Sequence, residues 1–399
     1  MAVQPRLADH HPDRPLPTGH RHPSIECIQD PSYTRVQLNP GCSMPSCSPM
    51  SASHHRPPPD MRAFQVLAPG RTELVETDDP APGPGEVLLQ VAATGVCHSD
   101  VFIRQAPPML GMSLPVTLGH EIVGVVREAG PGGDWAAGSQ VAVYVLRGCG
   151  SCSACKRGAD NLCRTGYRGI GTHTDGGLAE FVVVPARNLV DASGLDATTA
   201  APLTDAGLTA FHSVRSAASL TDDWSRTLVI GVGGLGHLAL QMVLATTEAE
   251  VITVDAHEGK LELAARLGAH HVVPAGAAAA NAVRDLVHGR EIDVVLDFVG
   301  ADDTLDLAAQ VTNRGSAIVV AGLGGGALGF EATSAGRLMP EVALRRVSAG
   351  SRTELAELFE LVRRTGIRPE VKCYPLDRAA EAVDAVEAGR ILGRAVVLP

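Results

Sequence analysis

The chain of 399 residues is poor in aromatic side chains, net positive charge and long apolar runs. Aromatic residues make up 3% of the sequence against 43 glycines, so we expect a core of small and aliphatic side chains with close backbone contacts. No apolar run reaches the ~18 residues of a transmembrane helix, and the N-terminus lacks the apolar segment of a secretory signal. The sequence therefore predicts no membrane partner and a cytoplasmic location.

The formal net charge of −11 argues against a protein that follows nucleic-acid phosphates, because such a protein needs a basic face. We expect no nucleic-acid partner. In a cytoplasm the nine cysteines should stay reduced, so clustered cysteines are expected to hold metal rather than pair as disulfides. The length predicts two or three domains, and two is the simpler assumption.

Residues 1–60 differ from the rest in holding twelve prolines and six histidines with little apolar periodicity. Such a composition cannot bury a core, which predicts a disordered N-terminal extension. The segment 61–66 has the pattern of a half-buried strand. We hypothesise that translation begins at Met61.

From 61 to 200, short strand-like segments alternate with turns rich in glycine and proline, which predicts a β-rich domain. Two of its loops offer metal ligands, Cys97 after the strand-like run 86–91 and His120 after the run 114–118. A catalytic zinc uses three protein ligands and leaves a fourth position open. Asp205 is the candidate third ligand. The alternatives are a buried cysteine, a core histidine and an aspartate that caps a helix starting at Ala206.

A second cluster contains four cysteines within fifteen residues. Their spacing allows the four thiolates to surround one zinc with no open position, which predicts a structural zinc lobe at 149–163. An iron–sulfur cluster, or four unrelated thiols, are the alternatives. The cysteines are Cys149, Cys152, Cys155 and Cys163.

After residue 200, apolar strands alternate with helical segments, which predicts a parallel sheet with helices on both faces. The strand 227–230 runs into Gly231, Gly233, Gly234 and Gly236, and a helical segment follows. A second strand ends at Asp255, nineteen residues after the last glycine of the turn. This pattern predicts a dinucleotide site in which the carboxylate binds a ribose and favours NAD over NADP. A ligand-free glycine turn is the alternative.

These motifs together resemble the zinc-dependent medium-chain alcohol dehydrogenases over residues 61–399, and most of all the bacterial NAD-dependent secondary-alcohol branch. The resemblance covers the Cys-His-Ser-Asp and Gly-His-Glu motifs, the four-cysteine lobe, the segment 176–181, the segment 202–209 and the glycine-rich turn. It implies an α/β fold with a GroES-like catalytic domain at 61–200, a Rossmann coenzyme domain at 201–340 and a return to the catalytic domain at 341–399. It also implies a homodimer or homotetramer.

The same resemblance implies roles for individual residues. Asp205 becomes the third catalytic zinc ligand, Glu121 a fourth or transient ligand, and Asp100 the acceptor that orients His120. Ser99 would pass the alcohol proton outward. The residues implied to contact NAD beyond the glycine-rich turn and Asp255 are His98 and Arg394 at the pyrophosphate, Thr209 at the nicotinamide and Lys260 at the adenosine ribose.

The reaction that follows is reversible hydride transfer between an alcohol, expected to be secondary, and NAD, with one catalytic and one structural zinc per chain. Phe102 stands where many relatives carry a histidine that ends the proton relay. Met112 and Ala349 stand where close relatives carry aromatic side chains, which predicts a roomier pocket. The alternatives are a polyol or other hydroxy-compound dehydrogenase, and a catalytically silent dinucleotide-binding protein.

Overall fold

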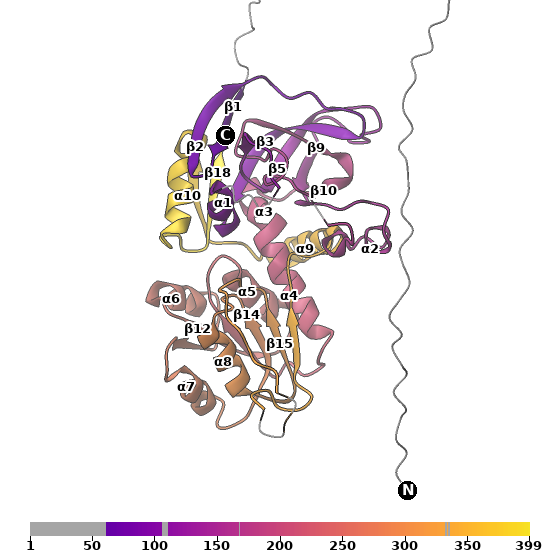
Figure 1. Ribbon diagram of the computed structural model, residues 1–399. Helices are drawn as coiled ribbons and strands as arrows, with labels where there is room; N and C mark the ends of the chain where they lie inside the picture. The colour runs from indigo at the N-terminus through magenta and orange to yellow at the C-terminus, as the bar shows by residue number, and fades with distance from the viewer. Residues whose placement is uncertain (1–60, 106–110, 167, 332, 334–335) are drawn as a thin grey trace, which may run out of the picture. The chain divides into compact units, whose positions relative to one another are not determined.

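The computed structural model describes residues 61–105, 111–166, 168–331, 333 and 336–399. The predicted extension at 1–60 lies outside these residues, so its disorder and the start at Met61 stay predictions. The described chain opens with the strand β1 (Met61–Ala68), which pairs antiparallel with β2 (Arg71–Thr77) and β4 (Val116–Thr117) (Figure 1).

A larger sheet carries the first metal-ligand candidate. Its strands lie in the order β10-β6-β5-β3-β18-β17, and β9 also pairs with β3. Along β3, Val87, Leu89 and Val91 are buried at every second position, as expected for a strand with one face on the core. The remaining strands of this region are β3 (Glu86–Val96), β5 (Glu121–Ala129), β6 (Gln140–Val143), β7 (Leu146–Arg147), β8 (Arg168–Gly169), β9 (Phe181–Pro185) and β10 (Leu189–Asp191).

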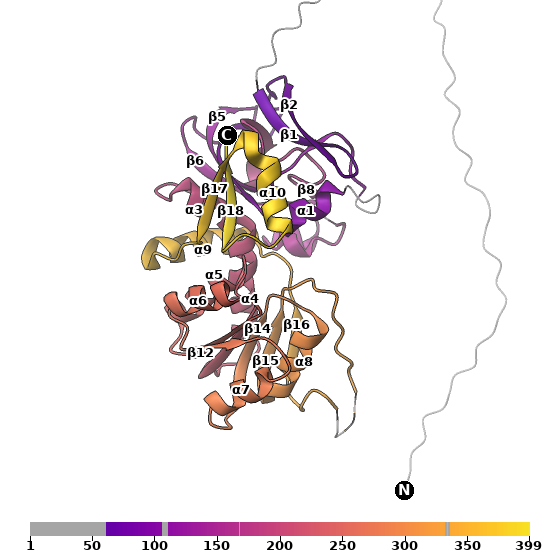
Figure 2. The same cartoon turned by 90° about the vertical axis from the view of Figure 1, so that its left-hand side faces the viewer.

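The C-terminal segment completes this sheet. Strand β17 (Val371–Pro375) pairs parallel with β18 (Arg394–Leu398), and β18 pairs antiparallel with β3. Helix α10 (Ala379–Glu387) contacts α1 (His98–Arg104), and Figure 2 shows it beside β18. Because Ala395 is opposite Val96 in the register, the neighbouring Arg394 is held close to the end of β3, where Cys97 follows.

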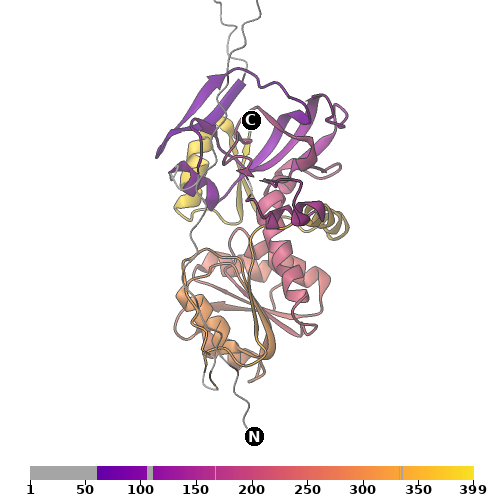
Figure 3. The same ribbon diagram turned by 45° about the vertical axis from the view of Figure 1, so that its right-hand side comes forward.

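The second sheet has six parallel strands in the order β13-β12-β11-β14-β15-β16, with helices on both faces (Figures 1 and 3). Val251 of β12 belongs to the core on one face, and its neighbour Ile252 belongs to the core on the other. The predicted doubly wound parallel sheet is therefore confirmed. Its last strand reaches Arg346 and so extends beyond the limit of 340 expected from the sequence. The strands are β11 (Arg226–Ile230), β12 (Glu250–Asp255), β13 (His271–Pro274), β14 (Ile292–Asp297), β15 (Thr312–Val320) and β16 (Ala343–Arg346).

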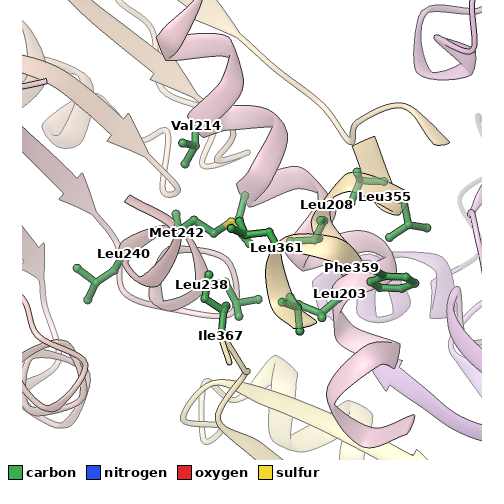
Figure 4. Close-up of a cluster of buried hydrophobic side chains, with 14 of the residues drawn as sticks. Leu203, Leu208, Val214, Leu238, Leu240, Met242, Leu355, Phe359, Leu361 and Ile367 are labelled. Atoms are coloured by element: carbon green, nitrogen blue, oxygen red, sulfur yellow. The ribbon is translucent and has the colours of Figure 1, made fainter. Parts of the chain in front are cut away.

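Helices α4, α5 and α9 pack on one another through a cluster of buried apolar side chains (Figure 4). It contains Leu208 of α4, Leu238 and Met242 of α5, and Leu361 of α9, all buried. No helix of the described chain is long and apolar enough to cross a bilayer. The remaining helices are α2 (Ser153–Lys156), α3 (Ala197–Pro202), α4 (Leu208–Ala218), α5 (Gly236–Thr246), α6 (Glu258–Arg266), α7 (Ala279–Leu286), α8 (Asp302–Val311) and α9 (Arg352–Thr365).

Candidate functional site

Cys97 is the N-cap residue of α1. The sequence predicted a loop here, and this prediction is wrong for residues 98–104, which are helical. The Cys97 thiol sulfur accepts a hydrogen bond from the Ser99 N–H at 3.2 Å, and the Asp100 carboxylate accepts one from the Cys97 N–H at 2.9 Å. This reciprocal capping fixes the position of the sulfur at the helix N-terminus. The acid three residues after Cys97 was the available sequence signal for the helix start.

His120 precedes β5 and is buried against Cys97. Its Nε2 atom lies 3.1 Å from the Cys97 sulfur, and its Nδ1 atom lies 3.2 Å from an Asp100 carboxylate oxygen. The second contact is the one expected for a carboxylate that orients a metal-binding imidazole. Burial opposes protonation of His120, but the negative charges of Asp100 and Cys97 raise its pKa well above the usual value.

Asp205 lies in a π-helical turn, Leu203–Gly207, between α3 and α4. Its side chain caps neither helix, so the N-cap alternative is wrong. One carboxylate oxygen lies 3.5 Å from the His120 Nε2 atom. Burial opposes ionisation of Asp205, whereas the contact with His120 lowers its pKa below the usual value. The turn therefore directs the carboxylate to the pair formed by Cys97 and His120.

Glu121 is fully buried beside these three groups. One carboxylate oxygen accepts hydrogen bonds from the Arg394 guanidinium at 2.5 Å and from the Ala206 N–H at 3.3 Å. Within the described chain its other oxygen, Oε2, has no hydrogen-bond partner. Burial raises the pKa of Glu121, and Arg394 opposes that rise. A buried oxygen without a partner is costly unless something else, such as a cation, coordinates it.

The donor atoms of Cys97, His120, Glu121 and Asp205 all lie within 4.8 Å of one another. Ligands around a tetrahedral zinc are separated by roughly 3.5 Å, as follows from zinc–ligand distances of about 2.0–2.3 Å. Sulfur, imidazole nitrogen and carboxylate oxygen are all ligand types that zinc accepts. The residues present therefore fit a zinc ion, and the unpaired Glu121 oxygen offers a further ligand.

The four cysteines of the predicted zinc lobe also meet in space, with their sulfurs within 4.8 Å of one another. The Cys149 sulfur accepts a hydrogen bond from the Cys152 N–H at 3.3 Å, and the Cys163 sulfur accepts one from the Cys149 N–H at 3.3 Å. Backbone N–H groups directed at sulfur stabilise thiolates, the form that binds metal. Among the described residues this metal-binding group consists of the four cysteines alone, and four sulfur ligands suit a structural zinc.

The glycine-rich turn connects β11 to α5. A Cβ atom on Gly236 would lie 1.8 Å from the Gly231 carbonyl oxygen, so only glycine fits there. At Gly233, by contrast, no described atom outside its neighbours lies within 4 Å of a Cβ position, which leaves room for a pyrophosphate. Asp255 accepts hydrogen bonds from the Val232 N–H at 2.8 Å and the His257 N–H at 2.9 Å, which fixes the carboxylate beside the turn.

Positive charge gathers next to this turn. The pKa of His98 is lowered by desolvation and then by the charges of Arg394 and Lys260. Arg394 lies over Gly234, because a Cβ atom there would be 2.5 Å from a guanidinium nitrogen. Arg394 and Lys260 are thus both near enough to His98 to act on its charge. Thr209, expected at the nicotinamide, is buried in the first turn of α4.

The sequence did not predict the ion pair between Arg394 and Glu121. The two residues are 273 positions apart and meet only because β18 pairs with β3. No local spacing signals such a contact. Phe102, on α1, is half exposed, and Ala349 adopts a left-handed backbone with φ of 51°. Met112 packs partly on the core that contains α10. That Met112 and Ala349 line the substrate pocket stays a prediction, and so does the place of Phe102 at the end of the proton relay.

Comparison with known proteins identifies the family. Residues 83–194 match the alcohol dehydrogenase GroES-like domain, and residues 234–364 match the zinc-binding dehydrogenase domain. The chain is 35% identical to an NAD-dependent alcohol dehydrogenase of Sulfurisphaera tokodaii over 359 residues, which covers 85% of this chain and 100% of the relative. The chain belongs to the zinc-dependent medium-chain alcohol dehydrogenase family.

Two solved structures are similar to the whole described region. The alcohol dehydrogenase of Aeropyrum pernix has a TM-score of 0.77 and 34% identity, and the match covers 85% of this chain and 100% of that one. The acetophenone reductase of Geotrichum candidum, solved in complex with NAD, has a TM-score of 0.73 and 32% identity, with coverages of 86% and 98%. The predicted combination of a GroES-like domain and a Rossmann domain is confirmed.

Proposed function

We propose that this chain is an NAD-dependent zinc alcohol dehydrogenase that interconverts a secondary alcohol and its ketone. The observation that supports the proposal most is the position of Arg394. Its guanidinium donates to Glu121 in the metal-donor group and also lies over Gly234 of the glycine-rich turn. One side chain therefore contacts both the metal-donor group and the glycine-rich turn, which places the two parts needed for metal-assisted oxidation of an alcohol by a dinucleotide next to each other.

Zinc, when bound, acts as a Lewis acid that lowers the pKa of an alcohol, and NAD accepts the hydride. The chain supplies the arrangement. Cys97, His120 and Asp205 would hold the ion, and Asp100 occupies the His120 Nδ1 atom, which leaves Nε2 free as the ligand atom. The exposed Ser99 would receive the alcohol proton on its hydroxyl while releasing its own hydroxyl proton to solvent, because its N–H bond to the Cys97 sulfur fixes the residue beside the ligands.

The substrate we propose is a bulky secondary alcohol or ketone. The acetophenone reductase named above is similar to this chain over most of its length. Met112 and Ala349 also stand where, by the family resemblance, close relatives carry aromatic side chains. Rates of NADH oxidation over a graded series of ketones test the proposal. We expect kcat/KM to rise from small to aryl ketones, and the opposite order would contradict it.

The test of the activity is a screen for NADH formation over secondary, primary and polyhydric alcohols, with metal content measured in parallel. Asp205→Ala should lower kcat/KM on the order of 100-fold or more, because it removes a metal ligand. Asp222→Ala, at an exposed aspartate, is the matched control and should behave as the wild type. Two zinc ions per chain are expected. Full activity of the Asp205→Ala variant would refute the proposed ligand set.

We also propose that the chain forms a homodimer or homotetramer. β16 is at the end of the parallel sheet and pairs only with β15 among the described strands, so its outer edge can pair further. Large apolar side chains are exposed in and before this strand, namely Leu323, Phe330, Met339 and Leu344. Light scattering on a Phe330→Asp variant should show dissociation, whereas Leu162→Asp, at an exposed leucine of the zinc lobe, should not. A monomeric wild type would contradict the proposal.

The location we propose is the cytoplasm. The four-cysteine group holds metal only while its thiols stay reduced, and the cytoplasm is the compartment that keeps thiols reduced. Fractionation of host cells tests this. Recovery of the zinc-loaded protein from a secreted fraction would contradict it.

A further inference from the structure

A fully buried histidine in the first turn of α5 has no role in the function proposed so far. His237 lies directly after the last glycine of the turn. Its Nδ1 atom is 2.7 Å from the Gly233 carbonyl oxygen, and its Nε2 atom is 3.3 Å from the Glu370 backbone nitrogen. A carbonyl accepts and an N–H donates, so the ring makes both bonds only when it is neutral and protonated on Nδ1.

Gln241, one helical turn further on, makes a matching contact. Its side-chain amide donates to the Arg368 carbonyl at 3.0 Å, and its amide oxygen accepts from the Arg368 N–H at 3.3 Å. Residues four apart lie on one face of a helix. This face of α5 therefore holds the segment 368–370, which leads into β17. Leu238 and Ile367, next in sequence to His237 and Arg368, belong to the same buried apolar cluster (Figure 4).

The held segment leads to Arg394. The Glu370 carbonyl accepts a hydrogen bond from the Arg394 N–H at 2.8 Å. Gly393, with φ of 78°, brings the two backbones so close that a Cβ atom there would lie 2.2 Å from that carbonyl oxygen. The Arg394 guanidinium then reaches back over Gly234. The contacts form a closed ring, from the glycine-rich turn through His237, Glu370 and Arg394 to the turn again.

We infer that His237 is a positioning residue for the coenzyme, which fixes the distance between the glycine-rich turn and the Arg394 guanidinium. The inference rests on the proposed use of NAD. Both parts of the ring contact the pyrophosphate under that proposal, so their separation sets how well the phosphates are bound. The reacting atoms lie at Cys97 and its partners, where Glu121 itself holds the Arg394 guanidinium at 2.5 Å, and His237 is bonded instead to Gly233 and Glu370. Loss of the bridge should therefore weaken coenzyme binding and leave the hydride step almost unchanged.

The experiment measures the dissociation constant of NADH by fluorescence, together with kcat at saturating NAD, on the zinc-loaded enzyme. His237→Leu removes both bonds and should raise the NADH dissociation constant about tenfold, with kcat within about twofold, since each net hydrogen bond corresponds to roughly a three- to tenfold change. His237→Gln places an amide oxygen near the former Nε2 atom and should restore part of the affinity. His271→Gln, at a histidine that contacts Glu250 on the sheet edge, is the control and should bind as the wild type.

An unchanged NADH dissociation constant in His237→Leu overturns the inference. A joint loss of kcat and affinity that His237→Gln fails to restore also overturns it, because a purely structural role of His237 predicts that pattern. Should His237→Leu fail to fold, Gln241→Leu takes its place, with an expected three- to fivefold rise, on the order of one hydrogen bond. Failure of the wild type to bind NADH would instead remove the proposed function itself.

Discussion

Acid should destabilise this protein through His237. Burial lowers the pKa of this histidine from 6.5 to about 4, the Gly233 carbonyl partly opposes that shift, and the charge of Arg394 adds to it. The folded state therefore favours the neutral ring. The stabilisation is complete above the unfolded pKa of 6.5 and is lost as the pH falls towards 4. A pKa of about 4 in place of 6.5 corresponds to about 3 kcal/mol, most of which is gone by pH 4.5.

Urea unfolding of the wild type and of His237→Asn, which cannot titrate, at pH 7.5 and pH 4.5 measures this loss. The two proteins share every other titrating group. The difference in their free energies of unfolding therefore changes between the two pH values only through His237. The wild type should lose roughly 2–3 kcal/mol relative to the variant over this range. Equal differences at the two pH values would refute the argument, since they would mean that the buried ring takes up a proton as readily as an unfolded one.

Three further predictions concern the other parts of the site. Gly233→Ala should keep the melting temperature of the wild type but weaken NADH binding at least about tenfold. Gly236→Ala should instead lower the melting temperature, because its Cβ overlaps the Gly231 carbonyl. Calorimetry and NADH titration distinguish the two effects. Asp255→Ser should raise the ratio of kcat/KM for NADP to that for NAD at least about tenfold, because a carboxylate repels a 2′-phosphate; equal ratios would contradict this. Cys163→Ser should cost one zinc per chain by metal analysis and several degrees of melting temperature, while turnover per remaining zinc is retained.

Local patterns in the sequence predicted most of the fold. The parallel sheet follows from alternating strands and helices, because both faces of such a sheet are buried and its strands are almost wholly apolar. The turn from Gly231 to Gly236 is local only in part. Gly236 must lack a Cβ atom because of the nearby Gly231 carbonyl, whereas Gly234 faces Arg394 from a distant segment. The four-cysteine group was predicted as a set from its spacing. In the other group, spacing left Asp205 open between ligand and helix cap, and only the family resemblance implied that Asp205 and Glu121 join Cys97 and His120.

Contacts between distant segments could not be predicted in the same way. The π-helical turn that carries Asp205 has no sequence signature of its own, and it decides whether the carboxylate caps a helix or joins the metal donors. The contact between Arg394 and Glu121 depends on the register of β18 against β3. A shift of one residue would turn the arginine to the other face of the sheet.

The pairing of β18 with β3 has a consequence for biosynthesis. Synthesis makes β3 long before β18, so the sheet that holds Cys97 stays incomplete until residues 394–398 have emerged. The parallel sheet consists only of strands between Arg226 and Arg346. It can therefore fold before the sheet that holds Cys97 is complete, although most of the strands of that sheet are synthesised earlier. A nascent chain that stops before residue 394 therefore lacks both β18 and Arg394.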